Sequence, residues 1–192
     1  MDTVNIFCFG FGQVAKHFIK KLHDDGISFK LSSTSREESK IKKFENINYE
    51  SFNLTEQNFD KNLLAKLENA DHILLSIAPI NGVDIVLKNF QNNFKPNKIK
   101  WMTYLSATSV YGDHGGKWVD ENSITNPTFI NGITRLKVEK EWIKFSNEFD
   151  LPIQIFRLSG IYSNQYNVLR RLKLGEAKIV NKKNHFFSRV HV

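Results

Sequence analysis

The sequence has little cysteine and proline and no long apolar run. Its 192 residues include one cysteine, Cys8, and four prolines. A single cysteine excludes an intrachain disulfide and favours a reducing compartment. The longest apolar stretch, near Ile73 to Ile80, is too short to span a bilayer. The N-terminus has no basic region followed by an apolar stretch and a small-residue cleavage site, so no secretion signal is predicted. We therefore expect a soluble, cytoplasmic protein with no membrane contact.

Blocks of one charge and metal-ligand spacings are also absent. The net charge of +7 and the pI of about 9.4 would suit a polyanionic partner. The lysines are spread along the chain with acids between them, however, so we expect no nucleic-acid partner. The six histidines, His185 and His191 included, lie far apart and Cys8 has no partner cysteine, so no metal site is predicted. Neither a Gly-x-Ser-x-Gly elbow nor a Walker loop occurs.

The first feature that is present is a glycine turn after an apolar run. Val4 to Phe9 has the length and composition of a buried parallel strand. Gly10-x-Gly12-x-x-Ala15 follows, and an amphipathic helix extends to about Asp25. Gly10 allows a tight turn, Gly12 lets the backbone approach a pyrophosphate, and Ala15 lets the helix pack closely. Because a helix N-terminus attracts phosphate, the pattern predicts a dinucleotide site rather than an idle turn.

Strands alternate with helices along the rest of the chain. Further strands are predicted over 27–31, 47–52, 72–79, 99–105 and 152–158, and helices over 37–44, 59–67, 83–94, 131–149 and around 170–173. This order is typical of an α/β domain. We therefore predict a doubly wound, mostly parallel, Rossmann-type sheet of six strands with helices on both faces, as one dinucleotide-binding domain over residues 1–192.

The end of the second predicted strand indicates which dinucleotide is favoured. Ser32-Ser-Thr-Ser-Arg36 lies about 20 residues past the glycines, where NAD enzymes place an acid and NADP enzymes an arginine. No acid precedes Arg36, so NADP is favoured over NAD. Alternatively, Arg36 merely begins the next helix beside Glu37 and Glu38. The predicted cofactor-binding residues are Gly10, Gly12, Gln13, Val14, Ser33, Arg36, Asn53, Leu54, Ala78, Pro79 and Ser106.

Five segments resemble one known superfamily, in the right order. They are the glycine turn, Ser109-Val-Tyr-Gly112, Glu121 with Pro127, Arg157-Leu-Ser-Gly-Ile-Tyr162, and Ser188-Arg-Val-His-Val192. On these motifs the chain resembles the extended and atypical short-chain dehydrogenases/reductases, the NAD-dependent epimerase/dehydratase-like proteins. The resemblance implies a Rossmann-type fold, a nicotinamide cofactor, and hydride transfer with a sugar-nucleotide-like or other small carbonyl substrate. It also implies a homodimer through the helix over 131–149 and a C-terminal substrate portion that we expect to be absent after Val192.

The resemblance further implies a catalytic Ser/Thr, Tyr and Lys, and all three positions differ here. They are occupied by Ala107, Asn131 and Arg135. In the family Tyr moves a proton, Lys lowers the pKa of that Tyr, and Ser or Thr orients the substrate. Alanine has no hydroxyl, asparagine exchanges no proton near neutral pH, and arginine stays protonated. Tyr111 and His114 are better proton donors, but we expect a packed tyrosine and a surface histidine.

Two hypotheses remain, the first based on the glycine turn, Arg36 and the family motifs, and the second on the altered trio. The first is an NADP-dependent oxidoreductase, epimerase/dehydratase-like, with an atypical active site. The second is a non-catalytic dinucleotide-binding or sensor module, or a decayed fragment.

Overall fold

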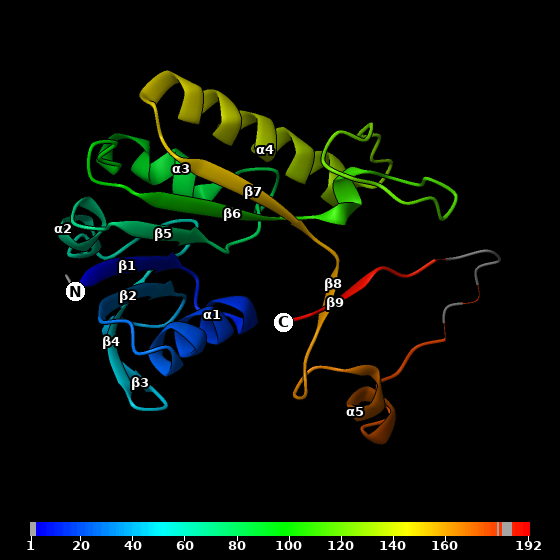
Figure 1. The fold of residues 1–192 in the computed structure, drawn as a ribbon, viewed down its shortest axis with the longest axis horizontal. Coiled ribbons are helices and arrows are strands. Elements are labelled where there is room, and N and C mark those ends of the chain that lie inside the picture. The colour runs from blue at the N-terminus through cyan, green and yellow to red at the C-terminus, as the bar shows by residue number, and fades with distance from the viewer. Residues whose placement is uncertain (1–2, 180, 182–185) are drawn as a thin grey trace.

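The structure is a computed structural model of the chain that describes residues 3–179, 181 and 186–192. It contains a seven-stranded sheet in the order β3-β4-β2-β1-β5-β6-β7 (Figure 1). The strands are β1 (Val4–Phe9), β2 (Phe29–Ser35), β3 (Lys40–Phe44), β4 (Ile47–Asn53), β5 (His72–Leu75), β6 (Trp101–Ala107) and β7 (Ile153–Leu158). All neighbours pair in parallel except β3, which is antiparallel to β4. Without β3 the order is that of a doubly wound dinucleotide-binding sheet, which confirms the predicted fold class.

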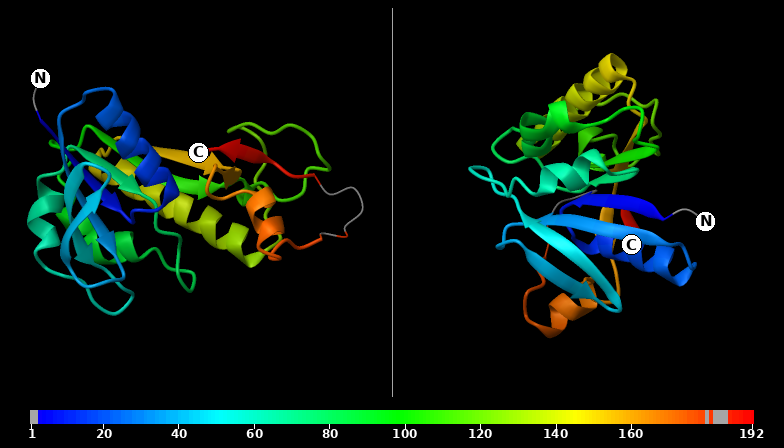
Figure 2. Two further views of the ribbon diagram at one scale, coloured as in Figure 1. Left: turned by 90° about the horizontal axis from the view of Figure 1, so that it is seen from below. Right: turned by 90° about the vertical axis from the view of Figure 1, so that its left-hand side faces the viewer.

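Helices cover both faces of this sheet (Figures 1 and 2). They are α1 (Gln13–Asp24), α2 (Leu63–Glu68), α3 (Ile85–Phe90), α4 (Ile130–Phe149) and α5 (Val168–Lys173), with 3-10 segments at Gln91–Asn93 and Thr108–Val110. Side chains of α1 pack on one face of the sheet, and side chains of α2, α3 and α4 pack on the other. The helix predicted over 131–149 is therefore present almost unchanged, and it lies against β6 and β7.

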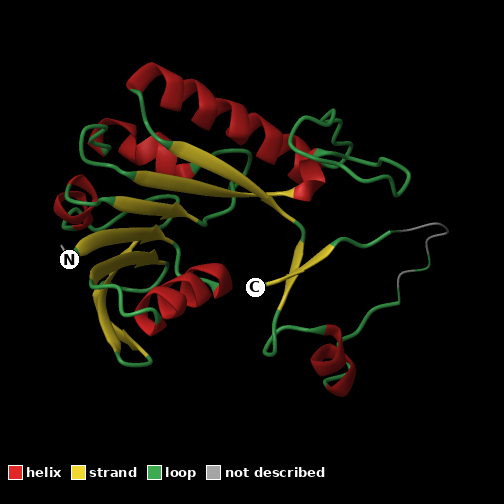
Figure 3. Ribbon diagram, in the orientation of Figure 1, coloured by secondary structure: helices red, strands yellow, loops and turns green. Residues whose placement is uncertain are grey.

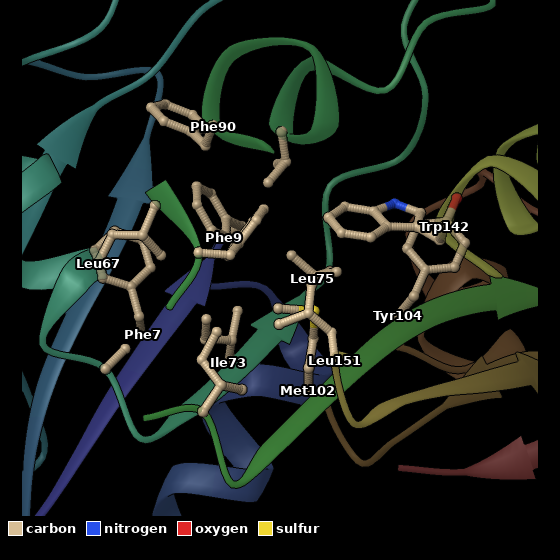
Figure 4. Close-up of a cluster of buried hydrophobic side chains, with 14 of the residues drawn as sticks. Phe7, Phe9, Leu67, Ile73, Leu75, Phe90, Met102, Tyr104, Trp142 and Leu151 are labelled. Atoms are coloured by element: carbon tan, nitrogen blue, oxygen red, sulfur yellow. The ribbon is translucent and has the colours of Figure 1, made fainter. Parts of the chain in front are cut away.

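Alternation of side chains along β1 divides the core into two parts. Phe7 and Phe9 point to the face covered by α2, α3 and α4, whereas Ile6 and Cys8 point to α1. Figure 4 shows the larger part, in which Phe9 and Trp142 are fully buried. Burial of a large apolar side chain contributes about 1.5–3 kcal/mol, so this cluster fixes α3 and α4 on the sheet.

The prediction of a helix over 37–44 is wrong, because residues 40–44 form the edge strand β3. Lys40-Ile-Lys-Lys-Phe44 pairs antiparallel with β4, and Glu45 takes φ +51° in the turn between the two strands. The polar, lysine-rich composition suggested a helix, but the hairpin places Phe44 against the apolar side chains of the α1 face. Ladder hydrogen bonds and this packing outweigh helix propensity, which is a weak preference. The sheet therefore has seven strands, not the six predicted.

The C-terminal part of the chain forms a small separate sheet. β8 (Gly160–Tyr162) and β9 (Arg189–His191) pair in parallel and lie apart from the main sheet, as does α5 (Figure 3). Within the described residues of α5, no side chain is buried. A search of the described residues for a helix long and apolar enough to cross a membrane finds none.

Candidate dinucleotide-binding site

The glycine turn joins β1 to α1 at the carboxyl edge of the sheet. Gly10 has φ +85°, and its N–H donates to Thr34 Oγ1 at 2.9 Å. A Cβ at Gly10 would lie 2.8 Å from Ser76 Oγ, which itself donates to the Phe9 carbonyl at 2.9 Å. The turn is thus held between β2 and β5, and both the backbone angle and the crowding at Gly10 require glycine.

Gly12 is the N-cap residue directly before α1, and it faces open space. A Cβ built there would meet no heavy atom of the described residues within 4 Å. Nor does any described side chain cap the N-terminus of this 12-residue helix, so its first backbone N–H groups are available to an anion. Ala15 is fully buried against the sheet, as the glycine pattern predicted. The structure therefore has room for a phosphate group where the sequence places it.

A cavity of about 980 Å³ opens from this turn. It lies along the carboxyl ends of β1, β2, β4 and β5, and so includes the point where the strand order reverses between β1 and β5. Six of the predicted cofactor-binding residues line it, namely Gly10, Gly12, Arg36, Leu54, Ala78 and Pro79. Ligands of doubly wound folds bind in this crevice, so the cavity is the candidate site.

The other five predicted residues do not line this cavity. Ser33 and Ser106 are buried, and neither hydroxyl has a hydrogen-bond partner among the described residues. Asn53 instead supports the wall, because its Nδ2 donates to the carbonyls of Arg36 at 3.2 Å and Glu37 at 3.1 Å. Gln13 starts α1, and its buried Nε2 lacks a partner within the described part of the chain. Val14 lines another cavity, between α1 and the β8–β9 sheet.

Charged side chains from three elements line the candidate site. Lys16 of α1, Arg36 after β2 and Lys42 of β3 are its cations, while Glu37 and Glu56 are its acids. Hydrogen bonds from Lys40 and Lys42 lower the pKa of the Glu37 carboxyl. Sequence reasoning missed Lys42 because residues 37–44 were assigned to a helix. Ile41 and Phe44 are three residues apart, a spacing that fits a helix rather than the alternation of a strand, so residues 40–44 gave no sequence signal for β3.

Two of the three positions of the altered catalytic trio line an adjoining cavity. It measures about 520 Å³, is lined by Asn131, Thr134 and Arg135 of α4, and shares Ala78, Pro79 and Asn81 with the larger cavity. Arg135 Nη1 donates to the Leu105 carbonyl of β6 at 3.0 Å. Ala107 ends β6 and does not line the cavity. The structure therefore brings Asn131 and Arg135 together beside the candidate site.

The polar groups at the adjoining cavity are suited to binding rather than to proton transfer. Asn131 and Thr134 offer hydrogen bonds, and Arg135 offers a guanidinium that stays charged. Tyr104 of β6 has a buried hydroxyl close to the Arg135 guanidinium, but it does not line this cavity. Burial raises the pKa of Tyr104.

Tyr111 and His114 serve structural roles. Tyr111 is buried and its hydroxyl accepts from Arg157 Nη1 at 3.2 Å. Arg157 Nη2 also forms an ion pair with buried Glu139 at 2.8 Å, which fixes α4 to β7. His114 Nε2 lies 3.1 Å from the carbonyl oxygens of Tyr111 and Ile124. Neither residue lines the candidate site or the adjoining cavity.

Metal ligands do not gather in the described part of the chain. Residues 3–179, 181 and 186–192 contain no group of three or more His, Cys, Asp or Glu that could hold an ion, and His185 lies outside them.

Comparison with known proteins supports the same fold. No family model matches the chain. Over 118 residues it is 29% identical to the uncharacterized UDP-glucose epimerase YtcB of Bacillus subtilis (strain 168). The match covers 52% of this chain and 36% of YtcB. A functionally unknown conserved protein from Silicibacter pomeroyi DSS has a TM-score of 0.76 and 28% identity, over 98% of this chain and 63% of that one. UDP-glucuronic acid 4-epimerase from Bacillus cereus, solved in complex with NAD, has a TM-score of 0.66 and 17% identity, over 89% and 63%.

The class defined by the fold and the site is a Rossmann-type protein with a glycine turn. The fold agrees with the one implied by the resemblance to the extended and atypical short-chain dehydrogenases/reductases, and over 118 residues the chain is similar to a UDP-glucose epimerase. The chain spans about a third of the curated relative's length and 63% of the length of these two solved structures.

Proposed function

We propose that this chain binds a nicotinamide dinucleotide, NADP in preference to NAD, in the 980 Å³ cavity. The observation that carries the proposal is the glycine turn. Gly12 faces open space, no described side chain caps the N-terminus of α1, and the cavity beside them is also lined by Arg36. The solved neighbour from Bacillus cereus was crystallised with NAD. The single buried Cys8 is consistent with action in the reducing cytoplasm.

The residues of the cavity have distinct roles in this proposal. Backbone N–H groups at Gly12 and the start of α1 would hold the pyrophosphate. Arg36 would bind a ribose phosphate through paired hydrogen bonds. Ala78 and Pro79, which line both cavities, would separate the cofactor from the substrate. When bound, the nicotinamide supplies the hydride chemistry.

The reaction that we propose is epimerase/dehydratase-like redox chemistry on a sugar-nucleotide-like or other small carbonyl substrate. Support comes from two of the three similar proteins, which are described as a UDP-glucose epimerase and a UDP-glucuronic acid 4-epimerase. Asn131 and Arg135 would bind and orient a substrate oxygen, but they cannot exchange its proton near neutral pH. That feature favours the second candidate function, a non-catalytic dinucleotide-binding or sensor module.

Fluorescence titration with NADPH and NADH tests the binding proposal. Gly12→Asp should weaken binding of both by at least tenfold, because a carboxylate would occupy the phosphate position and repel it. Gly12→Ala is the matched control for folding, since the added Cβ meets no described atom within 4 Å. Absence of binding of both cofactors to the unaltered chain below millimolar concentration would contradict the proposal.

Restoring the trio separates the two candidate functions. The triple variant Ala107→Ser, Asn131→Tyr, Arg135→Lys should gain NADP-dependent turnover of UDP-glucose if the missing proton donor alone prevents catalysis. Turnover by the unaltered chain would contradict the sensor module. Unchanged turnover in the triple variant would mean that the trio is not the missing element.

We also propose that two copies pair through the outer face of α4. Ile133 and Ile143 are 46% and 45% exposed there, beside a cavity of about 550 Å³. Ile143→Lys should convert a sedimenting dimer to a monomer, whereas the same change at loop residue Ile124 should not. A monomeric unaltered chain at high concentration would contradict the pairing.

A further inference from the structure

The edge hairpin formed by β3 and β4 is fixed to the glycine turn. Phe11, between the two glycines, packs against Phe44 of β3 with ring centroids 5.6 Å apart and against Tyr49 of β4 at 4.7 Å. Lys16 of α1 lies 5.8 Å from the centroid of the Phe44 ring. The position of β3 is therefore coupled to that of the phosphate-binding turn, and β3 forms one wall of the candidate site.

Lys42 is the side chain that β3 contributes to the cavity. It is paired with Tyr49 in the ladder, and its side chain is 21% exposed. Its Nζ donates to Ser35 Oγ at 3.4 Å and lies 3.2 Å from a carboxylate oxygen of Glu37. Buried Ser51 also donates to Ser35 Oγ, at 3.1 Å. An ammonium group and two hydroxyls thus meet at the end of β2, beside Arg36.

The neighbouring lysines are placed differently. Lys40 also binds Glu37, at 2.8 Å, but is 55% exposed and does not line the cavity. Lys43 is paired with Asn48 in the ladder, so it lies on the opposite face of the hairpin from Lys42. Lys43 therefore offers the same charge as Lys42 without access to the cavity.

The contacts of Lys42 are those that a phosphate monoester requires. A dianionic phosphate needs cations and hydroxyl or N–H donors, whereas a ribose 2′-hydroxyl needs no positive charge. A partly buried ammonium is costly without an anion, and Glu37 supplies that anion in the free protein. Glu37 is exposed and on a loop, so a better anion can displace it. Asn53 meanwhile holds the backbone at Arg36 and Glu37 in place.

We propose that Lys42, with Arg36 and the hydroxyls of Ser35 and Ser51, forms a binding site for a ribose 2′-phosphate, from which the incoming phosphate displaces the Glu37 carboxylate. The inference rests on the proposed function, and it adds the residue that decides between NADP and NAD. The sequence prediction of NADP was based on Arg36 alone. It gave no role to Lys42 of β3 or to the competing carboxylate of Glu37.

Calorimetric titration with 2′,5′-ADP and 5′-ADP tests this site apart from the nicotinamide half, alongside NADPH and NADH. Lys42→Met should weaken binding of the two 2′-phosphorylated ligands by about tenfold and leave the other two within about twofold. Lys43→Met, which removes the same charge from the opposite face, should change neither pair. Glu37→Gln should strengthen binding of the 2′-phosphorylated ligands, because it removes the competing carboxylate.

The outcomes distinguish this inference from the proposed function. Equal losses in Lys42→Met and Lys43→Met, or no change in the preference for 2′-phosphate, would overturn the role of Lys42 while dinucleotide binding stands. Unaltered protein that binds NADH and NADPH equally would also overturn it. If neither dinucleotide binds, the proposed function fails first. Thermal unfolding of each variant checks that the fold is intact.

Discussion

Gly10 and Gly12 are glycines for different physical reasons. Gly10 has φ +85° and a side chain there would collide with Ser76, whereas Gly12 has ordinary extended backbone and faces the cavity. Gly10→Ala should therefore reduce the free energy of unfolding by about 1–3 kcal/mol. Gly12→Ala should leave it nearly unchanged. Urea denaturation followed by circular dichroism measures both, and equal effects of the two changes would contradict this distinction.

Cys8 reports on the burial of β1. The thiol lies in the core between β1 and α1, and burial raises its pKa to about 12. Because the thiolate is the reactive form, the folded chain should resist iodoacetamide at pH 8 and react only after unfolding. Mass spectrometry of the alkylated protein measures this. Rapid labelling without denaturant would show that β1 is not buried as described.

His72 should make stability depend on pH. Desolvation by burial lowers its pKa below the ordinary value of 6.5, and its ring contacts Trp101. The unfolded chain therefore binds more protons just below pH 6.5, so this contribution to stability is complete above 6.5 and is lost as the pH falls through the lowered pKa. His72→Gln should flatten the curve of unfolding free energy against pH in this window. An unchanged slope would contradict the assignment.

At the scale of elements, the Glu139–Arg157 pair should dominate the attachment of α4 to β7. Glu139 is 1% exposed, and Arg157 also contacts Tyr111. Glu139→Ala leaves a partly buried guanidinium without its anion and should cost about 3–5 kcal/mol of unfolding free energy. Glu139→Gln retains the shape and a hydrogen bond and should cost less. A loss within about 0.5 kcal/mol for the alanine variant would mean that packing alone holds the helix.

Elements with a buried face could be predicted from the sequence, and the exception was an edge. The all-apolar run of β5 and the stripe of α4 are imposed by the core, so their patterns are strong. β3 has one paired edge and mostly exposed side chains, and its short lysine-rich sequence therefore suited a helix equally well. The site followed the same rule. The glycine turn was predictable, whereas Lys42 depended on a tertiary pairing that spacing does not encode.

At the scale of the whole molecule, the arrangement places two cavities side by side at the carboxyl edge of one sheet. The larger cavity begins at the glycine turn and the smaller at α4, and they meet at Ala78, Pro79 and Asn81. Asn81 and Gly82 both have positive φ in the tight turn between Ile80 and Val83. The meeting point lies after β5, next to the reversal of strand order between β1 and β5. We expect the dinucleotide to bind in the larger cavity and the substrate to bind in the smaller one.

A crystal structure of the chain grown with NADPH would show where the dinucleotide and its 2′-phosphate lie. We expect pyrophosphate density at the N-terminus of α1 against Gly12, the 2′-phosphate near Lys42 and Arg36, and the nicotinamide toward Asn131 and Arg135. NADPH bound elsewhere, or side chains closing the corner beside Gly12, would contradict this expectation.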